Sequence, residues 1–454
     1  MKKIITAAVL AVMAVSAVTA EEMNLDFNGR VAKSLASPEA SGPALADAPK
    51  AETKAGPKEW TVMVFINGKN DLELAGLYNV NQMEKIGSTK DMNIVVEIGR
   101  MKGQKQGDTA LDGDWTGSRR LLIKKDKDEE KITSPVVQED KVVDMGDYKR
   151  AVDFVKWSKE KYPAKRYMLI IWNHGSGWMD PLKESKGISF DDETGNYIRT
   201  PQIGLILKEA GKVNIMAFDA CLMNMAEVAY EVKDNSEVIV GSEETVPGLG
   251  YPYDLFLGAM AKNPALTTEE TGAIMVEAFK MFYDAMKKGA QLSALRASKM
   301  DGLAVKMSEF AKLAKEIGDM DALKAARAGV IRYDCIGPSD EKMTISFYGD
   351  VAQFAQLTAA NLKEHAKAAE LKQKAAALQE YIAKELVIYN KASGKNRVGR
   401  DLAESKGISV YLPPAETRIP QERLEGIFEG KYSDFAFDKA TGWHDFVTFL
   451  YGAK

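Results

Sequence analysis

The chain has 454 residues, of which 45% are hydrophobic and 28% charged, a composition typical of a soluble globular protein with one large core or two domains. Its formal net charge of −4 argues against a nucleic-acid partner, because binding to phosphates requires a basic surface. Beyond the N-terminal segment, no stretch reaches the roughly 18 apolar residues of a membrane span, so we expect none.

The first 20 residues have the pattern of a secretory signal peptide. Lys2 and Lys3 precede an apolar run at 4–15, and small residues follow up to Ala20, the expected cleavage point. The run is not followed by a cysteine, which excludes a lipoprotein anchor. We therefore expect a protein that is secreted or located in the periplasm or cell envelope.

The pattern changes at residue 59. Residues 21–58 are rich in Ala, Pro, Lys and Glu without apolar periodicity, which predicts a pro-segment or flexible linker. From there, continuous apolar strands alternate with helices, and this alternation predicts an α/β fold with a mostly parallel sheet covered on both faces. The predicted core spans 59–258. Its expected strands lie at 60–68, 92–99, 167–172, 212–219 and 236–244, and its first helices at 72–86 and 148–162.

The remaining segment, 259–454, is predicted to be mainly helical. Up to about residue 392 it is rich in Ala, Lys and Met at helical spacing. An apolar run at 406–413 then predicts a late strand that rejoins the central sheet.

Two predicted strand ends carry reactive side chains. His174 follows the strand at 167–172, and Cys221 follows the strand at 212–219. In open α/β sheets, ligands bind at the carboxyl ends of the strands. A thiol at a helix N-terminus gains thiolate character, and a nearby histidine can act as base and then as acid. Backbone N–H groups of Gly175 and Cys221 are candidates for an oxyanion hole.

Asp219 is a candidate for substrate recognition. Side chains two residues apart on an extended segment point to the same side, so its carboxylate is expected near the thiol of Cys221. A carboxylate there would suit a Lys or Arg side chain of a substrate. His174 lies 47 residues before Cys221, close to the spacing of about 50 residues between histidine and cysteine in the caspase signature.

The cysteines and histidines also have structural interpretations, which stay open as alternatives to a catalytic role. A buried cysteine is usually a small hydrophobe, and Cys221 and Cys335 could also form one disulfide. We expect Cys335 to be buried and inert. His444 is a rival base, and His365 is expected on the surface.

We expect no cofactor and no metal site. The three histidines lie far apart in sequence and do not have the spacing of zinc ligands. The acidic residues at 191–193 could bind calcium, but we expect a solvated acidic turn there instead.

Six motifs stand out in the chain: "WTVMVFINGKNDLE", "DWTGSRRLLI", "IIWNHGSGW", "SFDDETGNYIRTPQIG", "FDACLMNMAEVAYE" and "GSEETVPGLGYPY". Together they resemble the clostripain family of cysteine peptidases, which has a caspase-like fold. The resemblance covers about 60–255 and returns weakly near the C-terminus. It implies an α/β/α sandwich, a His174–Cys221 dyad, cleavage after Lys or Arg, and Asp219 at the base of the S1 pocket. The loop at 248–253 lacks a second acid that many members carry.

The loop at 179–189 is predicted to control activation. It is polar, contains Lys183 and Lys186, and begins just after the candidate base. Members of the family mature by a cut after a basic residue between the His and the Cys. This resemblance implies a zymogen that cleaves itself after Lys186 or, as a second choice, Lys183. A chain active without a cut is the alternative.

The sequence therefore predicts an exported cysteine endopeptidase, acting as a monomer on protein or peptide substrates with a basic P1 residue. A catalytically silent surface binding protein with the same fold is one alternative. A transpeptidase that uses the same acyl-enzyme is another.

Overall fold

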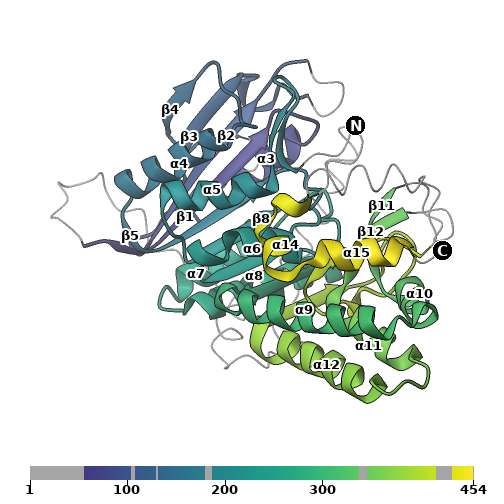
Figure 1. Cartoon of the computed structure of the whole chain (residues 1–454). Helices are drawn as coiled ribbons and strands as arrows, with labels where there is room; N and C mark the ends of the chain where they lie inside the picture. Colours follow the sequence, from purple (N-terminus) through teal and green to yellow (C-terminus); the bar gives the residue numbers. More distant parts are fainter. Residues whose placement is uncertain are drawn as a thin grey trace.

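The computed structural model describes residues 56–103, 108–128, 131–178, 187–336, 345–415 and 432–452 (Figure 1). The predicted signal peptide, most of the pro-segment, Lys183 and Lys186 lie outside these ranges. Within the described ranges, none of the helices has the length and hydropathy required to cross a bilayer.

A nine-stranded sheet forms the centre of the molecule, in the order β13-β10-β9-β8-β5-β1-β2-β3-β4. Its middle strands run parallel: β1 (Lys58–Gly68), β2 (Met92–Arg100), β5 (Ala164–Trp172), β8 (Ile215–Asp219) and β9 (Val238–Gly241). The outer strands are antiparallel: β3 (Gly117–Leu122), β4 (Val136–Asp140), β10 (Ala290–Arg296) and β13 (Val387–Ser393). All five strands predicted for the core are therefore confirmed, as the parallel centre of this sheet.

Helices cover both faces of the sheet because each central strand is apolar on both sides. In β1, Val62 and Val64 point into one buried cluster, whereas Met63 and Phe65 point into the other. The first cluster contains side chains of α3 (Glu73–Glu84), α7 (Tyr253–Lys262) and α8 (Thr268–Ala285). The second contains those of α4 (Tyr148–Lys161), α5 (Thr200–Ala210), α6 (Ala226–Val232) and α9 (Met300–Ile317). The predicted α/β/α sandwich is confirmed.

The C-terminal region packs beside this sandwich (Figure 1). Its further helices are α10 (Met320–Gly329), α11 (Val351–Asn361), α12 (Ala368–Tyr381), α14 (Ala436–Thr441) and α15 (Trp443–Gly452). A small antiparallel sheet lies among them, in the order β11 (Arg332–Ile336), β12 (Ile345–Asp350) and β14 (Ser409–Tyr411).

The late strand needs a correction. The segment predicted to rejoin the central sheet, 406–413, contains β14, which instead pairs with β12 in the small sheet. A late strand does rejoin the central sheet, but it is β13, which pairs with β10 at the edge. Because β13 is an edge strand with mostly half-buried residues, it lacks the continuous apolar run that marks a central strand.

Candidate active site

The structure brings His174 and Cys221 to neighbouring strand ends. Strands β5 and β8 pair in parallel, and the last pair in register is Trp172 with Asp219. Two residues further along each chain lie His174 and Cys221. The backbone N–H of Asn173 donates to the Asp219 carbonyl at 3.2 Å, so the two chains stay together beyond the strands.

Gly175 allows the two chain segments to touch. A Cβ atom at this position would lie 2.3 Å from the Cys221 carbonyl oxygen and 3.1 Å from the Cys221 nitrogen, so a larger residue would force the segments apart. The hairpin of β6 (Ile188–Asp191) and β7 (Asn196–Ile198) supports the same loop. There, Ser176 N–H donates to the Gly187 carbonyl at 3.1 Å.

Asp71 contacts the imidazole of His174, a partner that the sequence analysis missed. Its Oδ1 lies 2.7 Å from His174 Nε2, and both side chains are about half exposed. The hydrogen bond to His174 lowers the pKa of Asp71. Asp71 follows the end of β1, which is the neighbour of β5 in the sheet, so an acid after the first strand was the signal available in the sequence.

Cys221 is half-buried. The backbone N–H of Val246 lies 3.3 Å from its Sγ. The expected position at a helix N-terminus is wrong: a turn with Leu222 at φ 61° follows, and α6 begins only at Ala226. Asn224 explains the delay. Its backbone N–H donates to the Ser242 carbonyl and its side chain to the Gly407 carbonyl, so tertiary hydrogen bonds hold this segment out of the helix.

Asp219 lies at the end of β8 but is covered by the loop that follows β9. Only 3% of the residue is exposed, and its Oδ2 accepts hydrogen bonds from Tyr251 N–H at 2.9 Å and Tyr253 Oη at 3.0 Å. Burial raises the pKa of Asp219 to about 7. Gly250, at φ 67°, makes the cover possible, since a Cβ there would lie 2.7 Å from Oδ2.

The acidic turn at 191–193 is not a simple solvated turn, as Asp191 is buried. Its carboxylate pairs with Lys69 at 3.0 Å and accepts from Met145 N–H at 2.9 Å. Lys69 also pairs with Glu193. In the described part of the chain, we find no group of three or more metal-ligand side chains placed to hold an ion.

The sequence offered three further residues: His365, His444 and Cys335. His365 is exposed, as predicted. His444 lies on α15, where its backbone N–H donates to Asp438. The backbone of Cys335 lies in β11, and its side chain is outside what the structure describes.

An α/β/α sandwich with a histidine and a cysteine at adjacent strand ends defines the class of caspase-like cysteine peptidases. Within this class, the Clostripain family model matches residues 64–449, and the chain belongs to that family. The chain is 27% identical to clostripain from Hathewaya histolytica over 257 residues, which cover 48% of this chain and 49% of that protein. The match thus spans about half the length of this relative.

Two solved structures share the fold. One is a secreted C11 cysteine protease from Bacteroides thetaiotaomicron in complex with an irreversible peptide inhibitor, with a TM-score of 0.61 and 19% identity over 85% of this chain and 99% of that chain. The other is an inactive zymogen C11 protease from Parabacteroides distasonis, with a TM-score of 0.61 and 18% identity over 86% and 99%. The predicted family and caspase-like fold are confirmed.

Proposed function

We propose that the chain is an exported cysteine endopeptidase that uses Cys221 as nucleophile and His174 as general base and acid. The observation that carries the proposal is the register of β5 and β8 in a chain of the Clostripain family: the last pair, Trp172 with Asp219, comes two residues before His174 and Cys221. The N-terminal sequence pattern supports export.

The arrangement supports a thiol-dependent mechanism. His174 takes the proton of Cys221 Sγ, and the thiolate attacks the substrate carbonyl carbon. Backbone N–H groups at Gly175 and Cys221 would bind the oxyanion. The amine leaves with the proton from His174, and water hydrolyses the acyl-enzyme. The Val246 N–H, at 3.3 Å from Sγ, takes over the stabilising role that a helix terminus was expected to provide.

Asp71 is proposed as a positioning residue. Its contact with Nε2 of His174 leaves Nδ1 of the same ring for the thiol. The Asp71 carboxylate, by accepting a hydrogen bond from the ring N–H, also stabilises the imidazolium that forms when Cys221 loses its proton.

Asp219 is proposed to select Lys or Arg at P1, in agreement with its place two residues before the nucleophile. Its carboxylate is buried under residues 250–253, so a substrate side chain reaches it only if this loop shifts. The carboxyl group must also lose its proton to pair with the incoming cation. Both requirements make S1 recognition dependent on the loop and on pH.

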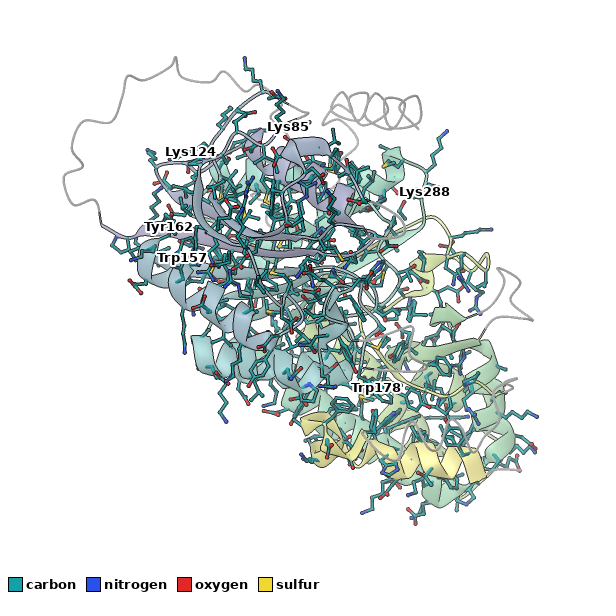
Figure 2. The ribbon with its side chains drawn as sticks, turned by 90° about the horizontal axis from the view of Figure 1, so that it is seen from above. Lys85, Lys124, Trp157, Tyr162, Trp178 and Lys288 are labelled. Atoms are coloured by element: carbon teal, nitrogen blue, oxygen red, sulfur yellow. The ribbon has the colours of Figure 1, made fainter. Side chains whose placement is uncertain are left out.

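Activation by a cut after Lys186, or after Lys183, is part of the proposal. Both sides of the 179–186 segment are anchored. Trp178 packs against Tyr411 and Tyr432 with ring centroids 5.0 and 4.9 Å away, and Figure 2 shows it where the C-terminal elements meet the central part of the molecule. On the other side, Ile188 pairs with Ile198. We therefore expect the two chains to stay associated after cleavage.

The function is tested with fluorogenic peptides that carry Lys, Arg or Asn at P1, before and after treatment with a thiol alkylator. We expect turnover of the Lys and Arg peptides, loss of turnover on alkylation, and the label on Cys221 in the peptide map. Turnover that survives complete alkylation of Cys221 would contradict the proposal.

A further inference from the structure

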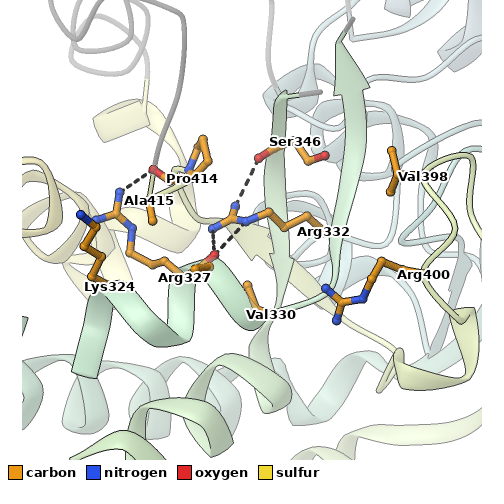
Figure 3. Close-up of a pocket in the computed structure, with 10 residues that line it drawn as sticks. Lys324, Arg327, Val330, Arg332, Ser346, Val398, Arg400, Pro414 and Ala415 are labelled. Atoms are coloured by element: carbon orange, nitrogen blue, oxygen red, sulfur yellow. Dashed lines mark hydrogen bonds between the residues drawn. The ribbon is translucent and has the colours of Figure 1, made fainter. Parts of the chain in front are cut away.

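A cavity in the C-terminal region is lined by residues that include neither His174 nor Cys221. It has a volume of about 290 Å³ and lies between α10, the small sheet and the segments around residues 398–400 and 413–415 (Figure 3). Four basic side chains line it: Lys324, Arg327, Arg332 and Arg400.

Arg327 and Arg332 are held by carbonyl groups instead of carboxylates. Arg327 donates to the carbonyls of Pro413, Leu450 and Pro414 at 2.9, 3.1 and 2.7 Å. Arg332 donates to the carbonyls of Arg327, Ser346, Leu412 and Pro413. Within the described residues, neither guanidinium has an ion-pair partner.

Among the residues that the structure describes, the positive charge of the cavity lining therefore exceeds its negative charge. Arg400 pairs with Glu404, whereas Lys324 is exposed at the rim and has no carboxylate partner in the part of the chain that the structure describes. Burial, together with the charge of Arg327, lowers the pKa of Arg332 to about 9. Buried charges are normally paired, because an unpaired buried charge carries a large desolvation cost.

We propose that this cavity is a binding site for the oxyanion group, carboxylate or phosphate, of a small molecule. All five N–H groups of Arg332 are used on carbonyls, so it contributes charge alone. Arg327 uses three of its five N–H groups on carbonyls, and the ammonium of Lys324 adds further donors. The volume is at the lower end of the range for ligand pockets, which favours a compact anion.

A purely structural role is the competing explanation. The arginines could serve only to clamp the chain after β14 and the end of α15 through their carbonyl groups. This role requires no anion. The two explanations therefore make different predictions for anion binding to the cavity and for the effect of a carboxylate introduced into its lining.

The test is calorimetric titration of the full chain with inorganic phosphate and, separately, with citrate, at constant ionic strength set by sodium chloride. We expect saturable one-to-one binding of at least one of these anions, and the comparison identifies phosphate or carboxylate as the preferred group. Lys324→Gln should weaken binding about tenfold, since it removes a charge-assisted hydrogen bond. Ala328→Glu, which brings a carboxylate to the cavity lining, should abolish binding and raise the melting temperature without ligand.

The matched control is Lys208→Gln, which removes another exposed helical lysine, on α5, and should bind like the wild type. The proposal is overturned if neither anion binds the wild-type chain saturably. It is also overturned if Lys324→Gln and Ala328→Glu bind as tightly as Lys208→Gln. Binding of acidic peptides in the absence of any binding of phosphate or citrate would equally overturn it.

Discussion

Asp71 and His174 are 103 positions apart in sequence, yet their side chains meet at 2.7 Å. If Asp71 positions the imidazole, Asp71→Ala should lower kcat roughly tenfold with little change in KM. The size of this effect corresponds to the loss of one charge-assisted hydrogen bond in the transition state. Asp71→Asn keeps an acceptor and should recover part of the rate. Because Asp71 is half exposed, thermal stability should barely change. Wild-type kcat in a folded Asp71→Ala protein would exclude this role.

The burial of the Asp219 carboxyl group leads to predictions about both stability and substrate specificity. The folded chain holds its proton up to a pKa of about 7, against an ordinary value of 3.8. The group therefore costs stability as pH rises from about 4 to about 7, and the cost is complete above that range. Asp219→Asn keeps the acceptor for Tyr251 N–H and Tyr253 Oη but has no charge to bury. We expect its melting temperature to match the wild type near pH 4 and to exceed it at pH 8.

The same substitution should lower kcat/KM for Lys and Arg substrates at pH 8 about tenfold or more, because the substrate cation loses its charged partner. In the wild type, kcat/KM for these substrates should rise as pH increases through about 7. A variant that cleaves basic substrates like the wild type would mean that another group forms the S1 base.

At the scale of elements, a buried acid pair links the catalytic sheet to the C-terminal region. Glu243 follows β9 and accepts from Gly407 N–H at 2.8 Å, and Asp350 is the last residue of β12 and accepts from Lys406 N–H at 2.6 Å. Burial, then the charge of Asp350, raises the pKa of Glu243, and burial raises that of Asp350 to about 6. Wild-type stability should thus fall as pH rises above the ordinary carboxyl range.

Glu243→Gln tests this link. Its amide can accept from Gly407 N–H and donate to Asp350 without a second negative charge, so unfolding midpoints should be higher than those of the wild type at pH 8 and similar at pH 4. Glu309→Gln, on the exposed face of α9, is the control and should follow the wild type at both values. Equal midpoints for Glu243→Gln and the wild type at pH 8 would show that the pair carries no such cost.

The elements that the sequence predicted are those whose pattern is local. Continuous apolar runs marked the five central strands, and strand ends marked His174 and Cys221. Strand β10 was missed because Gln291 and Ser293 interrupt its apolar pattern, although both are buried and hydrogen-bonded to distant groups. The late start of α6 and the Asp71 contact also depend on partners far away in sequence, which periodicity does not reveal.

At the scale of the whole molecule, we predict that the chain cuts itself and that the two resulting fragments stay associated. Purified wild-type protein should give a second N-terminus after Lys186, or after Lys183, and the two fragments should co-elute on size exclusion because the flanking segments belong to one packed body. Cys221→Ala protein should remain a single chain. A single-chain active wild type, or a Cys221→Ala protein cut at the same bond without added protease, would contradict self-activation.

The central claim is that Cys221 and His174 hydrolyse peptide bonds as a unit, and the direct measurement is kcat/KM of folded Cys221→Ala and His174→Ala on a Lys fluorogenic peptide. To separate chemistry from activation, each variant is first cut in the 179–186 segment by an added protease that is then removed. Each substitution should abolish measurable turnover while the melting temperature stays close to that of the wild type. Substantial turnover by either folded, cut variant would contradict the account.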